Sequence, residues 1–269
     1  MRFCAILGRS LRSRFEPVAF ELAIQEDGPV KPAKIRTPGG ADIAVHGVVD
    51  RVDVMRDGDT AYLRIVDYKT GSTKFSLENV LHGFNLQMLL YLFTLTEDAD
   101  SKFRGMRPAG ILYMPAKRPV RTDKEAPEDP NYIPELRMSG LVLGDSTVIA
   151  GMERDGSGRY IPAKLNASGE VGKQNRTATE QLFHELHRHI GRLLIQMADH
   201  LRAGDIRRAP VNGKDKPACQ YCDYAAVCGV DDQTEFEEVL SMSMEEIEKA
   251  LKGEETDGVP ADEGANTGD

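Results

Sequence analysis

Two alternating apolar segments joined by a tight turn constrain this fold more than any other feature of the chain. Residues 43–55 and 61–68 alternate apolar with polar side chains, as half-buried strands do. Asp57-Gly58 between them is one of the strongest short signals for a β-hairpin. We therefore expect two antiparallel strands lying side by side.

The other periodic segments add both strands and helices to this hairpin. Runs rich in apolar residues predict strands, and apolar residues at helical spacing predict helices. The predicted strands are 15–24, 108–114 and 137–143, and the predicted helices are 76–96, 177–201 and 243–252. This mixture indicates an α/β fold, with helices flanking a mixed sheet.

The hairpin also carries acidic and basic residues in the two segments GVVDRVD (47–53) and IVDYKTG (65–71). Strand alternation places Asp67 and Lys69 on one face and Tyr68 on the other, and Asp50 can reach the first face from the neighbouring strand. Carboxylate oxygens suit Mg²⁺ or Mn²⁺, and the backbone carbonyl of Tyr68 is a further candidate ligand. Lys69 would orient the attacking water or stabilise charge on the phosphorane. The pattern predicts a phosphodiesterase site.

Each of these residues also has an ordinary structural role open to it. An Asp-x-Lys pair on a strand is commonly an exposed ion pair. Gln87 and Tyr91 lie four residues apart, on one face of the predicted helix 76–96. They either contact a metal-bound water and DNA or belong to the surface and the core. Arg51 either binds a DNA phosphate or pairs with Asp53.

Three of the four cysteines, Cys219, Cys222 and Cys228, fall within ten residues of one another, far from Cys4. The sequence has no apolar run long enough to span a membrane and no signal-peptide pattern, so we expect a cytoplasmic protein. In that reducing compartment such spacing favours metal or cluster ligation over disulfides. Zinc, iron–sulfur and plain buried thiols all remain open.

The net charge of −9 is concentrated at the C-terminal end of the chain. Residues 229–269 carry a net −12, whereas residues 1–228 carry a net +3. The mildly basic body permits nucleic acid as a partner. We expect residues 229–269 to form a largely disordered acidic tail.

The motifs together resemble the RecB-like branch of the PD-(D/E)XK nucleases, from about residue 15 to residue 228. GVVDRVD, IVDYKTG, the Gln87-x-x-x-Tyr91 pair and GILYMP (110–115) carry this resemblance. It implies a restriction-endonuclease-like fold and a Mg²⁺-dependent deoxyribonuclease, expected to be an exonuclease. It assigns metal binding to Asp50 and Asp67, and it makes Glu21 a weaker candidate that either approaches the metal or faces solvent.

The cysteine segment ACQYCDYAAVC resembles that of AddB-type helicase–nuclease proteins. This resemblance implies a [4Fe–4S] cluster held by the three C-terminal cysteines and one upstream cysteine. It also implies a helicase–nuclease partner, single-stranded DNA ends as substrate, and a role in double-strand break repair.

Two features usual in that family are not found in this sequence: an upstream cysteine followed by proline and aromatic residues, and a helix with a metal-site histidine. The surroundings of Cys4 (RFCAILG) do not match the first. We therefore expect a fragment in which residues 1–14 form a partial helix, and which lacks full activity when isolated. The alternative function is a non-catalytic DNA-end-binding or scaffold module. The sequence also has no phosphate-binding loop for ATP.

Overall fold

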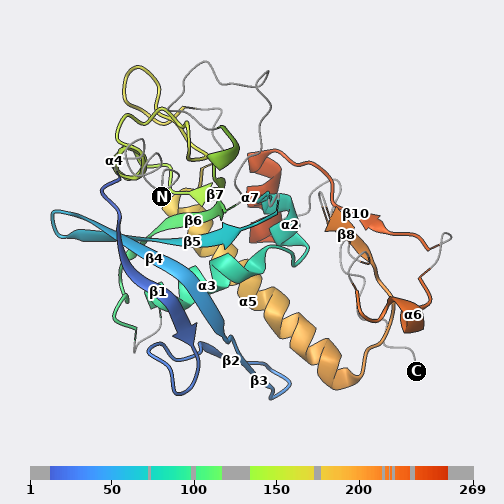
Figure 1. Cartoon of the computed structure of the whole chain (residues 1–269). Coiled ribbons are helices and arrows are strands. Elements are labelled where there is room, and N and C mark those ends of the chain that lie inside the picture. Colours follow the sequence, from blue (N-terminus) through green and yellow to red (C-terminus); the bar gives the residue numbers. More distant parts are fainter. Residues whose placement is uncertain are drawn as a thin grey trace.

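A five-stranded mixed sheet forms the centre of the molecule (Figure 1). The computed structural model describes residues 13–71, 74–97, 101–116, 134–172, 177–213, 216–217, 219, 222–230 and 234–253. The strand order is β1-β4-β5-β6-β7, and β5 and β6 are parallel while the other neighbours are antiparallel. The strands are β1 (Glu16–Ile24), β4 (Gly47–Asp57), β5 (Thr60–Lys69), β6 (Arg107–Pro115) and β7 (Ser139–Val142). The expected mixed α/β sheet is confirmed.

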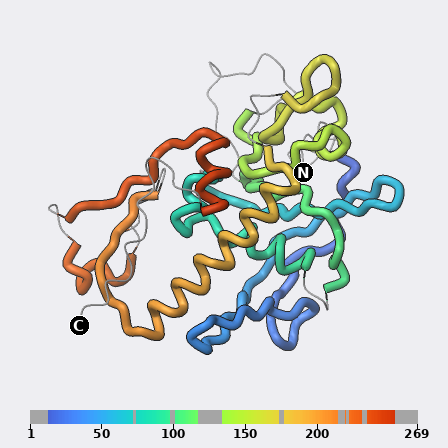
Figure 2. Tube along the Cα trace, turned by 180° about the vertical axis from the view of Figure 1, so that it is seen from behind, coloured from blue at the N-terminus to red at the C-terminus, as the bar shows by residue number. Residues whose placement is uncertain are grey.

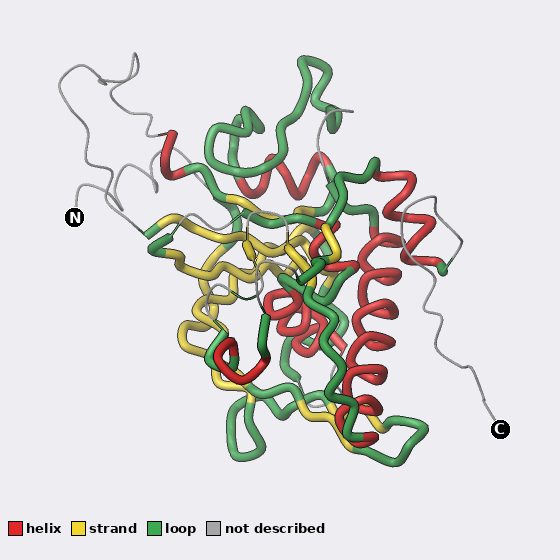
Figure 3. Tube along the Cα trace, turned by 90° about the vertical axis from the view of Figure 1, so that its right-hand side faces the viewer, coloured by secondary structure: helices red, strands yellow, loops and turns green. Residues whose placement is uncertain are grey.

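Helices cover both faces of this sheet. They are α2 (Leu77–Leu81), α3 (Leu86–Glu97), α4 (Ser146–Met152), α5 (Glu180–Ala203), α6 (Ala225–Cys228) and α7 (Met244–Lys252), with a 3₁₀ turn η2 (Pro134–Leu136). α3 packs on β5 and β6, and α5 packs on α3. Figure 2 shows α5 running across the rear of the molecule, and Figure 3 shows it beside the strand layer. None of the helices in the described ranges is both long and apolar enough to cross a bilayer.

Two small sheets lie outside the central one. The first pairs β2 (Lys34–Arg36) with β3 (Asp42–Ala44), and the second joins β8 (Val211–Gly213), β9 (Lys216–Pro217) and β10 (Glu237–Glu238). The segment predicted as a single strand over 43–55 is thus split between β3 and β4.

The predicted hairpin is present as β4 and β5, and its two loop residues are Gly58 and Asp59. Asp57 pairs with Thr60 across a two-residue turn, in which Gly58 adopts a φ of 58°. That positive φ is the conformation that the primed hairpin turns require of their first residue, and glycine adopts it without strain. The turn therefore fixes which residues of the two strands face each other.

The single helix predicted over 76–96 is wrong, because the chain breaks between α2 and α3. Gly83 and Asn85 adopt φ values of 84° and 56°, which no α-helix accommodates. Apolar residues continue at helical spacing through the break, so the periodicity did not reveal it. The break lets α3 start at a new angle directly over β5 and β6.

One part of residues 229–269 is folded, as the helix predicted there requires. The helix predicted over 243–252 is present as α7, and it begins with a capping box between Ser243 and Glu246. Ile247 and Leu251 are fully buried, and α7 packs on α2 and α5. This helix is therefore part of the folded domain despite its acidic composition.

Candidate active site

Asp50 and Asp67 lie next to each other where β4 and β5 begin to separate. The regular β4–β5 pairing ends at Arg51 and Val66, and one further step along this register places Asp50 opposite Asp67. Beyond the pairing, Oδ2 of Asp50 accepts a hydrogen bond of 2.9 Å from the backbone N–H of Tyr68. The Asp50 carboxylate thus reaches the peptide that directly follows Asp67.

Asp67 and Lys69 form a close ion pair on the same face of β5. Nζ of Lys69 lies 2.6 Å from Oδ2 of Asp67. The same Oδ2 atom is shielded from solvent and accepts no well-aligned hydrogen bond from any group that the structure describes. A buried carboxylate oxygen without a hydrogen-bond donor is costly unless a cation compensates it. The Lys69 ammonium is the cation that compensates this oxygen here, and the carboxylate oxygens of Asp50 and Asp67 are the ligand type that a hard divalent cation prefers beside it.

The peptide group of Tyr68 faces the same opening. In a strand, the N–H and C=O of one residue point to the same side, and the Tyr68 N–H points to Asp50. The Tyr68 carbonyl therefore points toward β4 beyond the last regular pair. This direction suits the role predicted for it as a further oxygen ligand.

Tyr113 and Asn85 complete the surroundings of Asp67, and the sequence did not single out either. Tyr113 on β6 is the register partner of Asp67, and its ring lies 5.7 Å from Nζ of Lys69. Burial, and then the charge of Asp67, raise the pKa of Tyr113 to about 12 despite a hydrogen bond to Asn85. Tyr113 therefore stays neutral and adds no further negative charge. Tyr113 could have been found by aligning the predicted strand GILYMP with β5, which places Tyr113 opposite Asp67.

Gln87 and Tyr91 interact with each other on α3, as their spacing predicts. Nε2 of Gln87 donates a 3.1 Å hydrogen bond to the Tyr91 hydroxyl. Gln87 is exposed, whereas Tyr91 is buried with its ring against the backbone of Gly47. This packing explains the glycine that opens GVVDRVD, since any Cβ there would overlap the tyrosine ring.

Gly47→Ala is expected to destabilise the protein by about 1 to 3 kcal/mol, the usual cost of an overpacked core. The added Cβ would lie 2.6 Å from Cζ of Tyr91 and closer still to its hydroxyl. Urea denaturation would measure the loss. Tyr91→Leu should relieve the clash, so the double variant should lose less stability than the sum of the two single variants. Simple additivity would contradict this packing.

The sequence matches the PD-(D/E)XK nuclease superfamily over residues 2–229. The chain belongs to this superfamily. The membership that the motifs predicted is therefore confirmed.

Longer ATP-dependent helicase/deoxyribonuclease proteins contain a region similar to this nuclease domain. One such helicase/deoxyribonuclease subunit, from Thermoanaerobacter sp., is 36% identical over 232 residues, covering 84% of the chain and 20% of the relative. The protein of the same name from Clostridioides difficile is 32% identical over 253 residues, covering 89% of the chain and 22% of the relative. The nuclease domain thus spans about a fifth of the length of these relatives.

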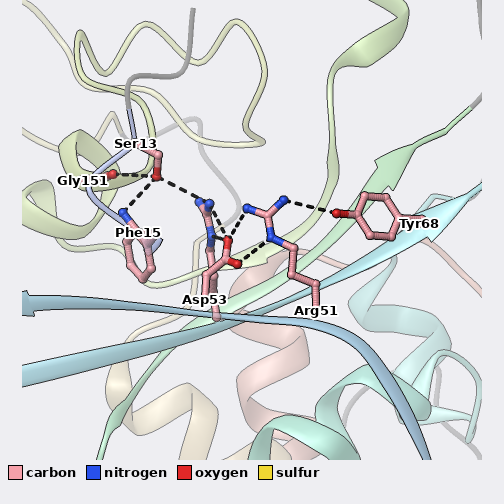
Figure 4. A network of polar contacts seen from close by, with 7 residues as sticks. Ser13, Phe15, Arg51, Asp53, Tyr68 and Gly151 are labelled. Carbon is pink, nitrogen blue, oxygen red and sulfur yellow. Dashed lines mark hydrogen bonds and ion pairs between the residues drawn. The ribbon is translucent and has the colours of Figure 1, made fainter. Parts of the chain in front are cut away.

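Arg51 of the nuclease domain pairs with Asp53, which is the second of the two roles considered for it (Figure 4). Its guanidinium makes two hydrogen bonds of 2.6 and 2.7 Å to Asp53, and its Nη1 donates to the Tyr68 hydroxyl at 3.3 Å. Arg51, Asp53 and the Tyr68 side chain therefore share the sheet face opposite Asp67 and Lys69.

Arg64 completes this network from β5. It is fully buried, donates two hydrogen bonds to Oδ2 of Asp53, and stacks 4.7 Å from the Phe15 ring centroid. Ser13 Oγ links the same group to Gly151 of α4 (Figure 4). Arg64 stands between Leu63 and Ile65 in an apolar strand. A charge in such a strand indicates that a buried acidic partner must exist for it.

Glu21 is exposed on β1 and adopts a φ of 47°, which is unusual for a residue other than glycine. Its neighbours Phe20 and Leu22 pair with Arg51 and Val49, so the β1–β4 register places Glu21 beside Asp50. The register thus brings a third acidic residue of the nuclease next to Asp50. A role for Glu21 in metal binding stays a prediction.

The three C-terminal cysteines lie in a segment of turns around α6. Their thiols are free, with Cys222 exposed and the other two half-buried. Within the described ranges, no three cysteine, histidine or acidic side chains are gathered as a metal site. Cys4, predicted as a weaker ligand, lies outside the described residues. The metal or cluster predicted for these cysteines therefore stays a prediction.

Proposed function

We propose that this domain is a Mg²⁺- or Mn²⁺-dependent deoxyribonuclease. The observation that supports it best is the convergence of Asp50, the Tyr68 peptide and the buried Oδ2 of Asp67 beside the Lys69 ammonium. When bound there, the cation would polarise the phosphate and acidify a water molecule.

Each residue of the candidate site has a separate role in this proposal. Asp50 and Asp67 would hold the cation, with the Tyr68 carbonyl as a third oxygen ligand and Glu21 as a candidate fourth from β1. The Lys69 ammonium would neutralise charge that develops on the phosphoryl oxygens, or orient the water that attacks phosphorus. Gln87, exposed beside Tyr91, would contact a substrate phosphate or a metal-bound water.

Kinship with helicase/deoxyribonuclease proteins supports a wider role in DNA double-strand break repair. Relatives with that name contain a region similar to this chain, which spans about a fifth of their length. We propose an exonuclease that acts on single-stranded ends in the cytoplasm, together with a helicase–nuclease partner. A non-catalytic DNA-end-binding or scaffold module is the second candidate, with the same fold and DNA contacts but no turnover.

The decisive experiment incubates the purified chain with end-labelled single-stranded DNA in Mg²⁺, Mn²⁺ or EDTA. We expect shortened products in either metal and none in EDTA. DNA retention in a gel shift without products in either metal would favour the binding module. Neither binding nor cleavage would reject both proposals for the isolated chain.

We also propose that Cys219, Cys222 and Cys228 ligate a [4Fe–4S] cluster with Cys4 as the weakest candidate for the fourth ligand, and Zn²⁺ as the alternative. Protein purified without oxygen should contain iron and acid-labile sulfide, and a Cys222→Ser variant should lose both. Zinc without sulfide would select the alternative. Thiols that react fully with a thiol reagent in metal-free protein would contradict both.

A further inference from the structure

Two aromatic side chains lie exposed on the sheet beside the candidate active site. Phe20 on β1 is 61% exposed and Tyr68 on β5 is 40% exposed. In the part of the chain that the structure describes, only Tyr224 is a further aromatic residue of such exposure. Stacking against a ligand would bury these two rings, which is favourable.

Arg51 lies between these two aromatic residues. Phe20 is its cross-strand partner on β1, and directly opposite residues of an antiparallel pair point to the same face. On the other side, Arg51 donates a hydrogen bond to the Tyr68 hydroxyl. Phe20, Arg51 and Tyr68 therefore form one continuous surface across three strands, here called the aromatic surface.

The aromatic surface carries a surplus positive charge. Asp53 is the shared carboxylate partner of both Arg51 and Arg64, so one negative charge faces two guanidinium groups. Nη1 of the buried Arg64 has no hydrogen-bond partner among the described groups. Arg51 is 17% exposed on its side chain and is the member of this cluster that reaches solvent. Exposed ring faces beside a cation suit a polyanion with aromatic bases.

The aromatic surface also adjoins the residues proposed for hydrolysis. Tyr68 stands between Asp67 and Lys69, and Lys69 is the last residue of β5. A nucleic acid strand with one phosphate beside Asp67 and Lys69 can pass round this end of β5. Its neighbouring bases would then meet the rings of Tyr68 and Phe20 on the opposite face.

We infer that Phe20, Arg51 and Tyr68 bind single-stranded DNA next to the bond that is cut. Unpaired bases can stack on the two rings while Arg51 attracts the phosphates. The bases of a duplex are already stacked on one another and offer no free face, so the aromatic surface selects single strands. This inference rests on the proposed nuclease function, and it names the residues that recognise the substrate.

Fluorescence anisotropy with labelled oligothymidylate tests the inference on the full chain in EDTA, where cleavage does not contribute. Phe20→Leu and Tyr68→Leu remove the ring but keep an apolar side chain, and each should raise Kd about tenfold. Phe20→Tyr and Tyr68→Phe keep a ring and should stay within about twofold of the wild type. Tyr224→Leu, which changes the exposed residue that precedes α6, is the matched control and should leave Kd unchanged. In Figure 1, α6 lies at the lower right and β1 at the left.

Several results would overturn the assignment. Unchanged Kd in both leucine variants would mean that the surface does not bind DNA, for example because it binds a protein. If the leucine variants weakened binding of a duplex of the same length as much as binding of the single strand, the rings would not recognise unpaired bases. Circular dichroism melting identifies misfolded variants, and a misfolded leucine variant is replaced by Phe20→Met or Tyr68→Met, which also remove the ring and should raise Kd equally. A chain that binds in this way but cuts DNA in neither Mg²⁺ nor Mn²⁺ would refute the proposed function and leave the aromatic surface standing.

Discussion

A chain carrying Asp67→Asn is expected to lose Mg²⁺-dependent DNA cleavage by about a hundredfold to a thousandfold or more. The substitution removes the charge of the carboxylate whose Oδ2 is buried without a hydrogen-bond donor. Calorimetric titration with Mn²⁺ should show weakened metal binding in the same variant. Single-turnover cleavage of end-labelled DNA measures the effect on the reaction itself.

Lys69→Met should reduce cleavage to a similar degree while leaving metal binding intact. Its ammonium pairs with Asp67 but, as a cation, it cannot ligate another cation. Lys102→Met is the matched control, since Lys102 is exposed and lies over Phe103, next to Arg56 at the hairpin end of β4. Cleavage at the wild-type rate in Asp67→Asn or Lys69→Met would remove that residue from the chemistry.

The strands and the pairing of Asp67 with Lys69 could be predicted because they depend on local rules. Alternation fixes which side chains share a face, and the Asp57-Gly58 signal locates the turn between β4 and β5 to within one residue. Together these rules bring the two carboxylates to the same end of the hairpin, and the observed turn at Gly58-Asp59 then sets Asp50 opposite Asp67. The observed mixed sheet confirms the predicted fold class, and the family match confirms the predicted superfamily.

What the sequence did not predict depends on backbone conformation and on register. The break between α2 and α3 is set by the left-handed conformation of Asn85. The spacing of apolar residues does not report that conformation, so the sequence pattern did not reveal the break. The acidic composition of residues 229–269 concealed the packing of α7. Its signal was the spacing of Ile247 and Leu251, four residues apart on one helix face.

Buried charges were the hardest feature to predict. Asp53 and Arg64 look like surface residues by composition, and only the β4–β5 register makes them direct partners. The sequence raised the pairing of Arg51 with Asp53 but could not choose it over a contact with DNA. Once Arg64 is known to share Asp53, the charge of Arg51 is only partly neutralised, and both roles become compatible.

Asp53→Ala is expected to destabilise the domain by about 3 to 5 kcal/mol, the usual cost of removing one partner from a buried ion pair. Asp53 is fully buried, and the variant would leave the buried Arg64 guanidinium without a counter-charge in the apolar core. A thermal melt should show a Tm lowered by about 10 °C. The Tm of Asp53→Asn should fall between those of the wild type and Asp53→Ala, because the amide oxygen can still accept a hydrogen bond while the charge is lost.

Asp57→Ala is the matched control on the same strand. Asp57 also pairs with an arginine, Arg14, but both side chains are about half exposed, so its loss should cost no more than about 1 kcal/mol. Equal Tm shifts in Asp53→Ala and Asp57→Ala would show that burial does not make the Asp53 pair special. A large loss in Asp53→Ala alone would establish that GVVDRVD serves two purposes, with Asp50 directed to the reaction and Asp53 to the stability of the hairpin that carries it.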